Sequence, residues 1–252
     1  MKKHLLFLSA LVCMICGAIC AQTLEGDFYI EEISVSISPY EGKADTILNK
    51  TWFTKDKFRR EQGTEGRVTI GCLDKGLFWI IDLTDSTYSE LNLAVIRQMS
   101  ILSVGMMGPQ IDANGQLKVP DDLYIKTGEK TKIGQWNTEK VVLNENYTKS
   151  GLIQNFAMWI SPDTEIPSGL YSGLMKNILG DPNGELKKLL DLWGGLRGYP
   201  IRVEIQAMGY TTITTTTKIE RRKAPEGIFD LPEGMTEVTS PFMEQLKSMP
   251  GQ

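Results

Sequence analysis

Apolar and polar residues alternate over most of this 252-residue chain, in short segments separated by turn residues. A period of two is typical of a strand that buries one face. The segments expected to form strands are 28–37, 46–53, 57–62, 68–73, 77–82, a short stretch around Tyr88, 130–133, 138–144, 153–160, 201–207 and 213–219. Turns such as Asp74-Lys75-Gly76 join them, with a glycine where a positive φ is needed. The pattern therefore predicts sequential antiparallel hairpins, about ten strands in all, rather than alternating βαβ units.

Three segments break the alternation and have the spacing of helices instead: 91–107, 167–179 and 185–196. In the first of them, apolar residues recur at helical spacing on one face and also occupy the other faces. A helix that is apolar on more than one face is usually buried between layers. Because there is no linker and no internal repeat, one α+β domain is predicted over residues 22–238. Residues 239–252 are expected to be a C-terminal tail, in a region that is loosely held from Met235 onward.

Residues 1–21 have the layout of a cleaved secretory signal. Two lysines near the start precede an apolar stretch over residues 5–19, and small or aliphatic residues follow. Cleavage would remove His4, the only histidine, and three of the four cysteines. We therefore expect an exported, periplasmic protein. Lipid attachment at Cys20 is disfavoured, because the bulky Ile19 stands where lipoprotein signals have a small residue.

The chemistry available to the processed chain is narrow. Without histidine there is no Ser-His or Cys-His nucleophile pair and no imidazole ligand for a metal, and Cys72 is expected to be a buried core thiol. Neighbouring carboxylates occur at Glu31 and Glu32, at Asp82 and Asp85, and at Asp121 and Asp122. Glu31 and Glu32 point to opposite faces of a strand, and Asp82 and Asp85 flank a turn, which favours solvated carboxylates over a two-carboxylate active site. We expect no enzyme, no catalytic residue, no metal and no cofactor.

Charge and hydropathy exclude two further classes of partner. The whole chain has 27 basic and 31 acidic residues, and the signal segment removes basic residues only. An acidic chain lacks the electrostatic footprint of nucleic-acid binding or of attraction to an anionic membrane surface. No later segment has the run of about 18–20 apolar residues that a membrane-spanning helix needs. We therefore expect a protein that does not span the membrane.

Two stretches of the chain resemble a known family. Residues 127–140 (TGEKTKIGQWNTEK) match a characteristic motif, and Gly198-Tyr199-Pro200 followed by residues 225–234 (PEGIFDLPEG) match its closing segment. They are similar to a secreted bacterial family of unknown function that resembles the outer-membrane lipoprotein carrier (LolA-like) superfamily. This resemblance implies a curved antiparallel half-barrel wrapped around about three helices, which line or plug an apolar cavity, and it carries no catalytic residue. One departure is Gln135-Trp136-Asn137, where the family commonly has Gly-Tyr and a small residue.

These observations favour a non-catalytic binding or carrier-like protein that holds an apolar ligand, such as a lipid or a lipoprotein acyl chain. Methionine adapts to flexible acyl chains, and three methionines lie within residues 91–107. The side chains expected to line the apolar pocket are Val95, Met99, Leu102, Met106, Leu174, Leu190 and Trp193. The alternative is a structural or interaction protein of the cell envelope with a plugged cavity, in which exposed Trp52, Trp136 and Trp159 contact a partner protein. The sequence leaves ligand identity and oligomeric state open.

The signal segment gives a direct test. We expect protein isolated from the envelope fraction of the cells that make it to begin at Gln22, because export removes residues 1–21. N-terminal sequencing checks this expectation. Protein recovered from the cytosolic fraction with His4 still attached would contradict it.

Overall fold

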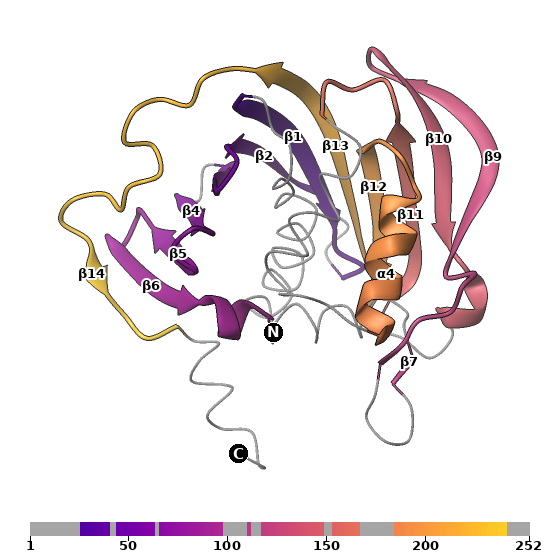
Figure 1. Cartoon of the computed structure of the whole chain (residues 1–252), viewed down its shortest axis with the longest axis horizontal. Helices are drawn as coiled ribbons and strands as arrows, with labels where there is room; N and C mark the ends of the chain where they lie inside the picture. The colour runs from indigo at the N-terminus through magenta and orange to yellow at the C-terminus, as the bar shows by residue number, and fades with distance from the viewer. Residues whose placement is uncertain are drawn as a thin grey trace.

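A twelve-stranded sheet that curves around the interior of the molecule forms the main part of the fold (Figure 1). The computed structural model describes residues 26–40, 44–63, 66–97, 110–111, 117–148, 153–166 and 184–240. The strands of this sheet are β1 (Phe28–Ile37), β2 (Ala44–Phe53), β3 (Lys57–Gln62), β4 (Arg67–Cys72), β5 (Leu77–Asp82), β6 (Thr87–Asn92), β9 (Tyr124–Ile133), β10 (Trp136–Leu143), β11 (Ile153–Ser161), β12 (Tyr199–Ala207), β13 (Tyr210–Arg221) and β14 (Thr236–Glu237). The other described elements are β7 (Gln110–Ile111), β8 (Leu117–Lys118), the 3-10 helix η2 (Glu145–Tyr147) and α4 (Gly184–Gly194).

Two meanders make up the sheet. Strands β1 to β6 are neighbours in chain order, and so are β9 to β13. The meanders are joined where β1 pairs with β13 in an antiparallel ladder that runs the whole length of β1. One register shift, between Glu31 and Glu32, makes Thr217 an extra residue on β13. The sheet stays open: β14 pairs with β6 at one edge, and β9 forms the other edge.

The predicted sequential hairpins are confirmed, and β1, β3 and β5 have the expected bounds. Strand β9 begins at Tyr124 rather than at residue 130, because most of its side chains are exposed on both faces and no alternation marks its start. Leu91 was expected to begin a helix but belongs to β6. Its side chain is 1% exposed and lies opposite Phe78, so it packs on the inner face of the sheet.

One of the three expected helices is described over its full length. It is α4, which corresponds to the segment predicted at 185–196. Residues 93–97 are helical, whereas 98–107 and 167–179 lie outside the described part of the chain. The α+β class is therefore supported as a sheet-dominated fold, and the count of three helices is not confirmed.

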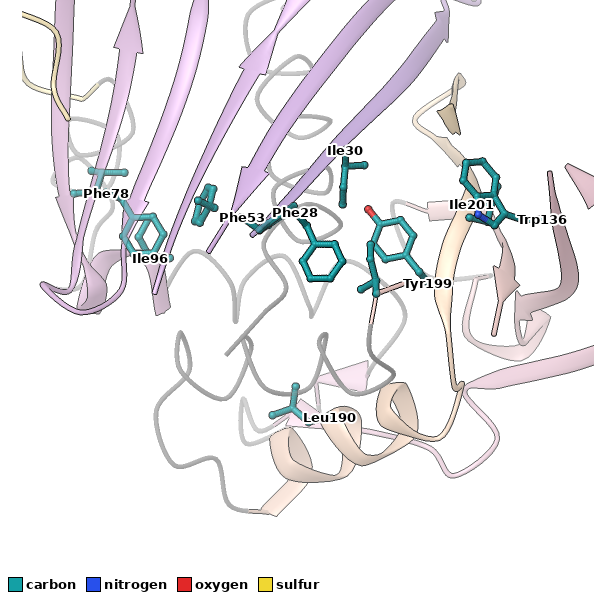
Figure 2. Packing of buried hydrophobic residues seen from close by; sticks show 12 residues of the cluster. Phe28, Ile30, Phe53, Phe78, Ile96, Trp136, Leu190, Tyr199 and Ile201 are labelled. Carbon is teal, nitrogen blue, oxygen red and sulfur yellow. The ribbon is translucent and has the colours of Figure 1, made fainter. Parts of the chain in front are cut away.

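The inner face of the sheet carries most of the apolar core. The first inner cluster consists of Phe28, Ile30, Phe53, Phe58, Phe78, Leu91, Ile96, Trp136, Ile166, Leu190, Tyr199 and Ile201 (Figure 2). The second inner cluster consists of Val119, Leu123, Val141, Leu143, Ile153, Phe156, Met158, Ile160, Leu189 and Val203. Helix α4 contributes Leu189 to one cluster and Leu190 to the other, so it covers the inner face where the two clusters meet.

Residues 222–237 run along the outer face of the first meander, and we call this segment the strap (Figure 1). The Arg222 N–H donates to the Asp27 carbonyl at 3.0 Å, and Arg59 Nη1 donates to the Ile228 carbonyl at 3.1 Å. Phe229, Leu231 and Met235 of the strap pack against the outer cluster, which consists of Val68, Ile70, Cys72 and Ile81. The strap therefore shields apolar side chains that would otherwise face water.

The region after Met235 is held more firmly than the sequence predicts. The Thr236 N–H donates to the Ser86 carbonyl at 2.9 Å, and the Val238 N–H donates to the Tyr88 carbonyl at 2.8 Å. The expectation of a loosely held chain from Met235 onward is thus wrong for these residues, because a two-residue strand leaves no periodic signal. Residues 241–252 lie outside the described part of the chain.

Gly71 and Phe58 provide a test of inner-face packing. They lie opposite each other across β4 and β3, and a Cβ atom added at Gly71 would overlap the Phe58 ring. We expect Gly71→Ala to lower the free energy of unfolding by about 1–3 kcal/mol, since the ring must move in a close-packed core. Urea denaturation measures the effect. Gly195→Ala is the matched control, because a Cβ there meets only ordinary contacts; equal losses in the two variants would contradict the packing argument.

Candidate functional site

An aromatic row crosses the inner face of the first meander. The row consists of successive ladder partners on β1 to β6: Phe28, Phe53, Phe58, Gly71, Phe78 and Leu91. Directly opposed residues of antiparallel strands share one face of the sheet. The ring centroids of Phe53 and Phe58 are 6.4 Å apart, and those of Phe58 and Phe78 are 5.9 Å apart. The row therefore presents a continuous apolar surface to the interior.

Trp193 of α4 links the two halves of this interior. It packs against both inner clusters, and its Nε1 donates to Tyr124 Oη at 3.0 Å. At the other end of α4, the Glu185 carboxylate accepts a hydrogen bond from the Val119 N–H at 2.6 Å. These two contacts tie α4 to the segment that leads into β9, and they hold its apolar side against the sheet.

Three of the residues predicted to line the pocket are described, and each belongs to the first inner cluster or packs against it. Leu190 is buried in the first inner cluster, and Val95 and Trp193 are partly buried against the same cluster. Met99, Leu102, Met106 and Leu174 lie outside the described part of the chain. A ligand-binding role for all seven residues stays a prediction.

The sequence did not predict that the inner face is polar beside the aromatic row. The next row of ladder partners consists of Ile30, Thr51, Arg60, Thr69, Ile80 and Ser89. One row further, Glu32 lies opposite Asn49. We call the buried polar residues of these two rows the polar zone: Glu32, Asn49, Thr51, Arg60, Thr69 and Ser89.

An ion pair lies at the centre of the polar zone. Arg60 Nη1 is 3.2 Å from Glu32 Oε2, and the two residues are only 2% and 4% exposed. Asn49 Nδ2 donates to Ser34 Oγ at 2.9 Å, and Ser34 Oγ shares a hydrogen bond of 2.9 Å with Thr214 Oγ1. The described residues of the zone thus contribute one cation and one anion, and their hydrogen bonds extend across β2, β1 and β13.

A signal for the polar zone is present in the sequence. In a strand over residues 57–62, Phe58 and Arg60 share one face, and Glu32 shares a face with Phe28 and Ile30. The period of two therefore places both charges on the core side. The usual preference of charged residues for solvent conceals this signal.

The tryptophans expected to be exposed are buried. Trp52, Trp136 and Trp159 are 6%, 7% and 8% exposed. Charged side chains cover the two that face outward: the Arg222 guanidinium lies 5.0 Å from the Trp52 ring, and the Arg202 guanidinium lies 5.3 Å from the Trp159 ring. These three rings are therefore not exposed anchors for a partner, which the second hypothesis had offered as one way to contact it.

The groups considered for catalysis lie in structural positions. Cys72 is buried beneath the strap, and burial raises the pKa of its thiol, which stays protonated near neutral pH. Glu31 and Glu32 point to opposite faces, since Tyr29 Oη donates to Glu31 and Glu32 pairs inward. Asp82 accepts hydrogen bonds from backbone N–H groups of its own turn. Within the described ranges, no group of three or more His, Cys, Asp or Glu side chains could hold a metal ion.

Solved structures with a similar chain path were found, although no protein-family model and no curated protein matches this chain. An uncharacterised conserved protein from Thermus thermophilus is similar with a TM-score of 0.46 and 9% identity, over 92% of this chain and 98% of its own. A LolA superfamily protein from Nitrosomonas europaea is similar with a TM-score of 0.34 and 11% identity, over 89% and 97%. The structure of PNGF-II is similar with a TM-score of 0.39 and 14% identity, over 88% of this chain but only 32% of its own.

The LolA superfamily predicted from the sequence is thus represented among the similar structures. All three TM-scores are below 0.5 and all three identities are below 25%. The similarity therefore identifies neither a ligand nor an activity.

The buried ion pair yields a prediction on stability. Arg60→Met would leave the Glu32 carboxylate buried without its cation, so we expect the free energy of unfolding to fall by about 3–5 kcal/mol. The double variant Glu32→Leu/Arg60→Met should recover most of that loss, because both charges are removed together. Urea denaturation of the single and double variants measures this coupling.

Lys187→Met is the matched control for that cycle. Lys187 pairs with Asp191, and both side chains are more than half exposed, so its loss should change stability by less than about 1 kcal/mol. Equal effects of Arg60→Met and Lys187→Met would show that the inner pair is not buried in solution.

Proposed function

We propose that this chain is a non-catalytic binding or carrier-like protein that holds an apolar ligand against the inner face of its curved sheet. The ligand is a lipid or a lipoprotein acyl chain. The observation that carries the proposal is the aromatic row, against whose cluster Val95, Leu190 and Trp193 pack. Predominantly apolar linings with a few placed polar groups are typical of small-molecule sites. Met99, Leu102, Met106 and Leu174 belong to the proposed lining.

The proposal includes export of the protein. Cleavage after residue 21 would deliver the domain formed by residues 22–238 to the periplasm, where an acyl chain needs shielding from water. Among the described residues, no helix combines the length and the apolar character needed to cross a membrane.

The placement of the reactive groups supports binding rather than catalysis. The Cys72 thiol is covered by the strap, and the Asp82 carboxylate is engaged by its own turn. The Glu32 carboxylate is neutralised by Arg60. Among the described residues, none pairs with the Cys72 thiol as a general base, which nucleophilic catalysis by a thiol would require.

A second candidate function, contact with an envelope protein, is favoured by one observation on the outer face. Ile33 and Leu48 lie opposite each other there and are 37% and 40% exposed, and Ile37 on the same strand is 40% exposed. Exposed apolar side chains that adjoin one another are a feature of interaction surfaces. This surface is on the opposite side of the sheet from the aromatic row, so the two functions can be tested separately.

Tryptophan quenching tests the proposed ligand site. Mature protein freed of lipid is titrated with the methyl ester of 9,10-dibromostearic acid, because bromine quenches an indole ring that it contacts. We expect saturable quenching in the wild type, with an affinity of about micromolar or better, as the burial of a long acyl chain supplies about 0.8 kcal/mol per methylene group. In Trp193→Phe the quenched fraction should fall markedly.

Trp159→Phe is the matched control for this titration, since it removes one tryptophan from the outer face. Its quenched fraction should be at least as large as that of the wild type. Absence of saturable quenching in the wild type would reject the proposed function, and equal quenching in the two variants would place the ligand elsewhere than beside α4.

A further inference from the structure

We propose that the polar zone is a subsite for the polar head of an amphiphilic ligand whose acyl chain lies along the aromatic row. The head is uncharged and carries hydroxyl groups, as in a monoacylglycerol. This inference rests on the proposed function and deepens it by naming the class of ligand.

The first step is the position of the zone. On β2, Thr51 is two residues from Phe53 of the aromatic row, and on β3, Arg60 is two residues from Phe58. Two residues along a strand span about 7 Å, and their side chains share one face. The inner face therefore changes from apolar to polar within one side-chain spacing, which matches the junction between an acyl chain and its head group.

The second step is the free-energy cost of burying the polar zone in a protein that binds only hydrocarbon chains. The Glu32–Arg60 pair is almost completely buried, and a buried pair is often less stabilising than apolar residues of similar volume. A sheet that bound alkyl chains alone would be more stable with a row of apolar side chains in this position. A charged pair on the binding face contributes to binding when it forms hydrogen bonds with polar atoms of the ligand.

The third step is the charge of the ligand. Arg60 Nη1 lies 3.2 Å from Glu32 Oε2, so among the described residues of the zone each charge has the other as its counterion. An ionised carboxylate or phosphate placed beside them would be a buried charge without a counterion, which is strongly unfavourable. Hydroxyl groups can donate to a carboxylate and accept from amide and hydroxyl groups without that penalty.

The fourth step is the Thr51 hydroxyl. Thr51 is 1% exposed, lies opposite Arg60 in the ladder, and its Oγ1 has no hydrogen-bond partner among the described residues. A buried hydroxyl without a partner destabilises a protein, and each such group in a native structure calls for an explanation. A ligand hydroxyl would provide the partner that the described residues do not provide.

The test compares two ligands with the same acyl chain. Lipid-free mature protein is titrated with 1-monoolein, which has two free hydroxyl groups, and with methyl oleate, which has none. We expect wild-type protein to bind monoolein about fivefold or more tightly than methyl oleate, the equivalent of about one net hydrogen bond. In Thr51→Val this preference should fall to near unity while the affinity for methyl oleate stays unchanged.

Thr51→Ser is the matched control, because it keeps the hydroxyl and should keep the preference. Thermal unfolding of Thr51→Val should occur at the same temperature as in wild type or higher, since a methyl group replaces an unsatisfied hydroxyl. A loss of preference with an unchanged unfolding temperature therefore reports on the subsite rather than on misfolding.

The outcomes separate the two proposals. If neither ester binds, the proposed function is rejected and the subsite with it. If both bind equally well to wild type, or if Thr51→Val keeps the preference for monoolein, the subsite is rejected and the apolar site stands. Oleate is titrated in the same way as a third ligand, and tighter binding of oleate than of monoolein would overturn the assignment of an uncharged head.

Discussion

The antiparallel ladder between β1 and β13 is the interaction on which the rest of the structure depends. It joins two meanders, within each of which the paired strands follow one another in the sequence. It also brings together residues such as Ser34 and Thr214, which are 180 positions apart. Closing so long a loop costs conformational entropy, which backbone pairing over the whole of β1 offsets. Without this ladder the aromatic row and the second inner cluster would belong to separate half-sheets and would not face a common interior.

Two coverings complete this sheet, one on each face. Helix α4 lies inside, and the strap lies outside against β3 to β6 (Figure 1). Residues 68–72 of β4 are all buried, so both faces of this strand are covered, and the strap covers the outer one. The strap contains residues 225–234, one of the stretches on which the family resemblance rests. That stretch therefore has a structural role: it shields the outer cluster from water and does not contribute to the inner face.

The strands and their sequential hairpins could be predicted because alternation and short turns are local signals, whereas the curved sheet was implied by the family resemblance. The sequence-based predictions were wrong where the local structure depends on pairing with another strand. Leu91 continues a strand because it lies opposite Phe78, and Thr236 pairs because the edge of β6 is available. The inward charges of Glu32 and Arg60 follow the strand period, yet only the folded sheet brings them within 3.2 Å of each other. For the same reason the sequence offered candidate apolar residues for a pocket but did not predict the polar zone.

The free edge of β9 determines how the protein behaves when copies meet. A ten-residue strand that is exposed along nearly its whole length would ordinarily recruit the same strand of a second molecule and begin a fibre. Lys126, Lys130 and Lys132 are all exposed on this strand. Exposed lysines on an edge strand disfavour edge-to-edge pairing with a second copy.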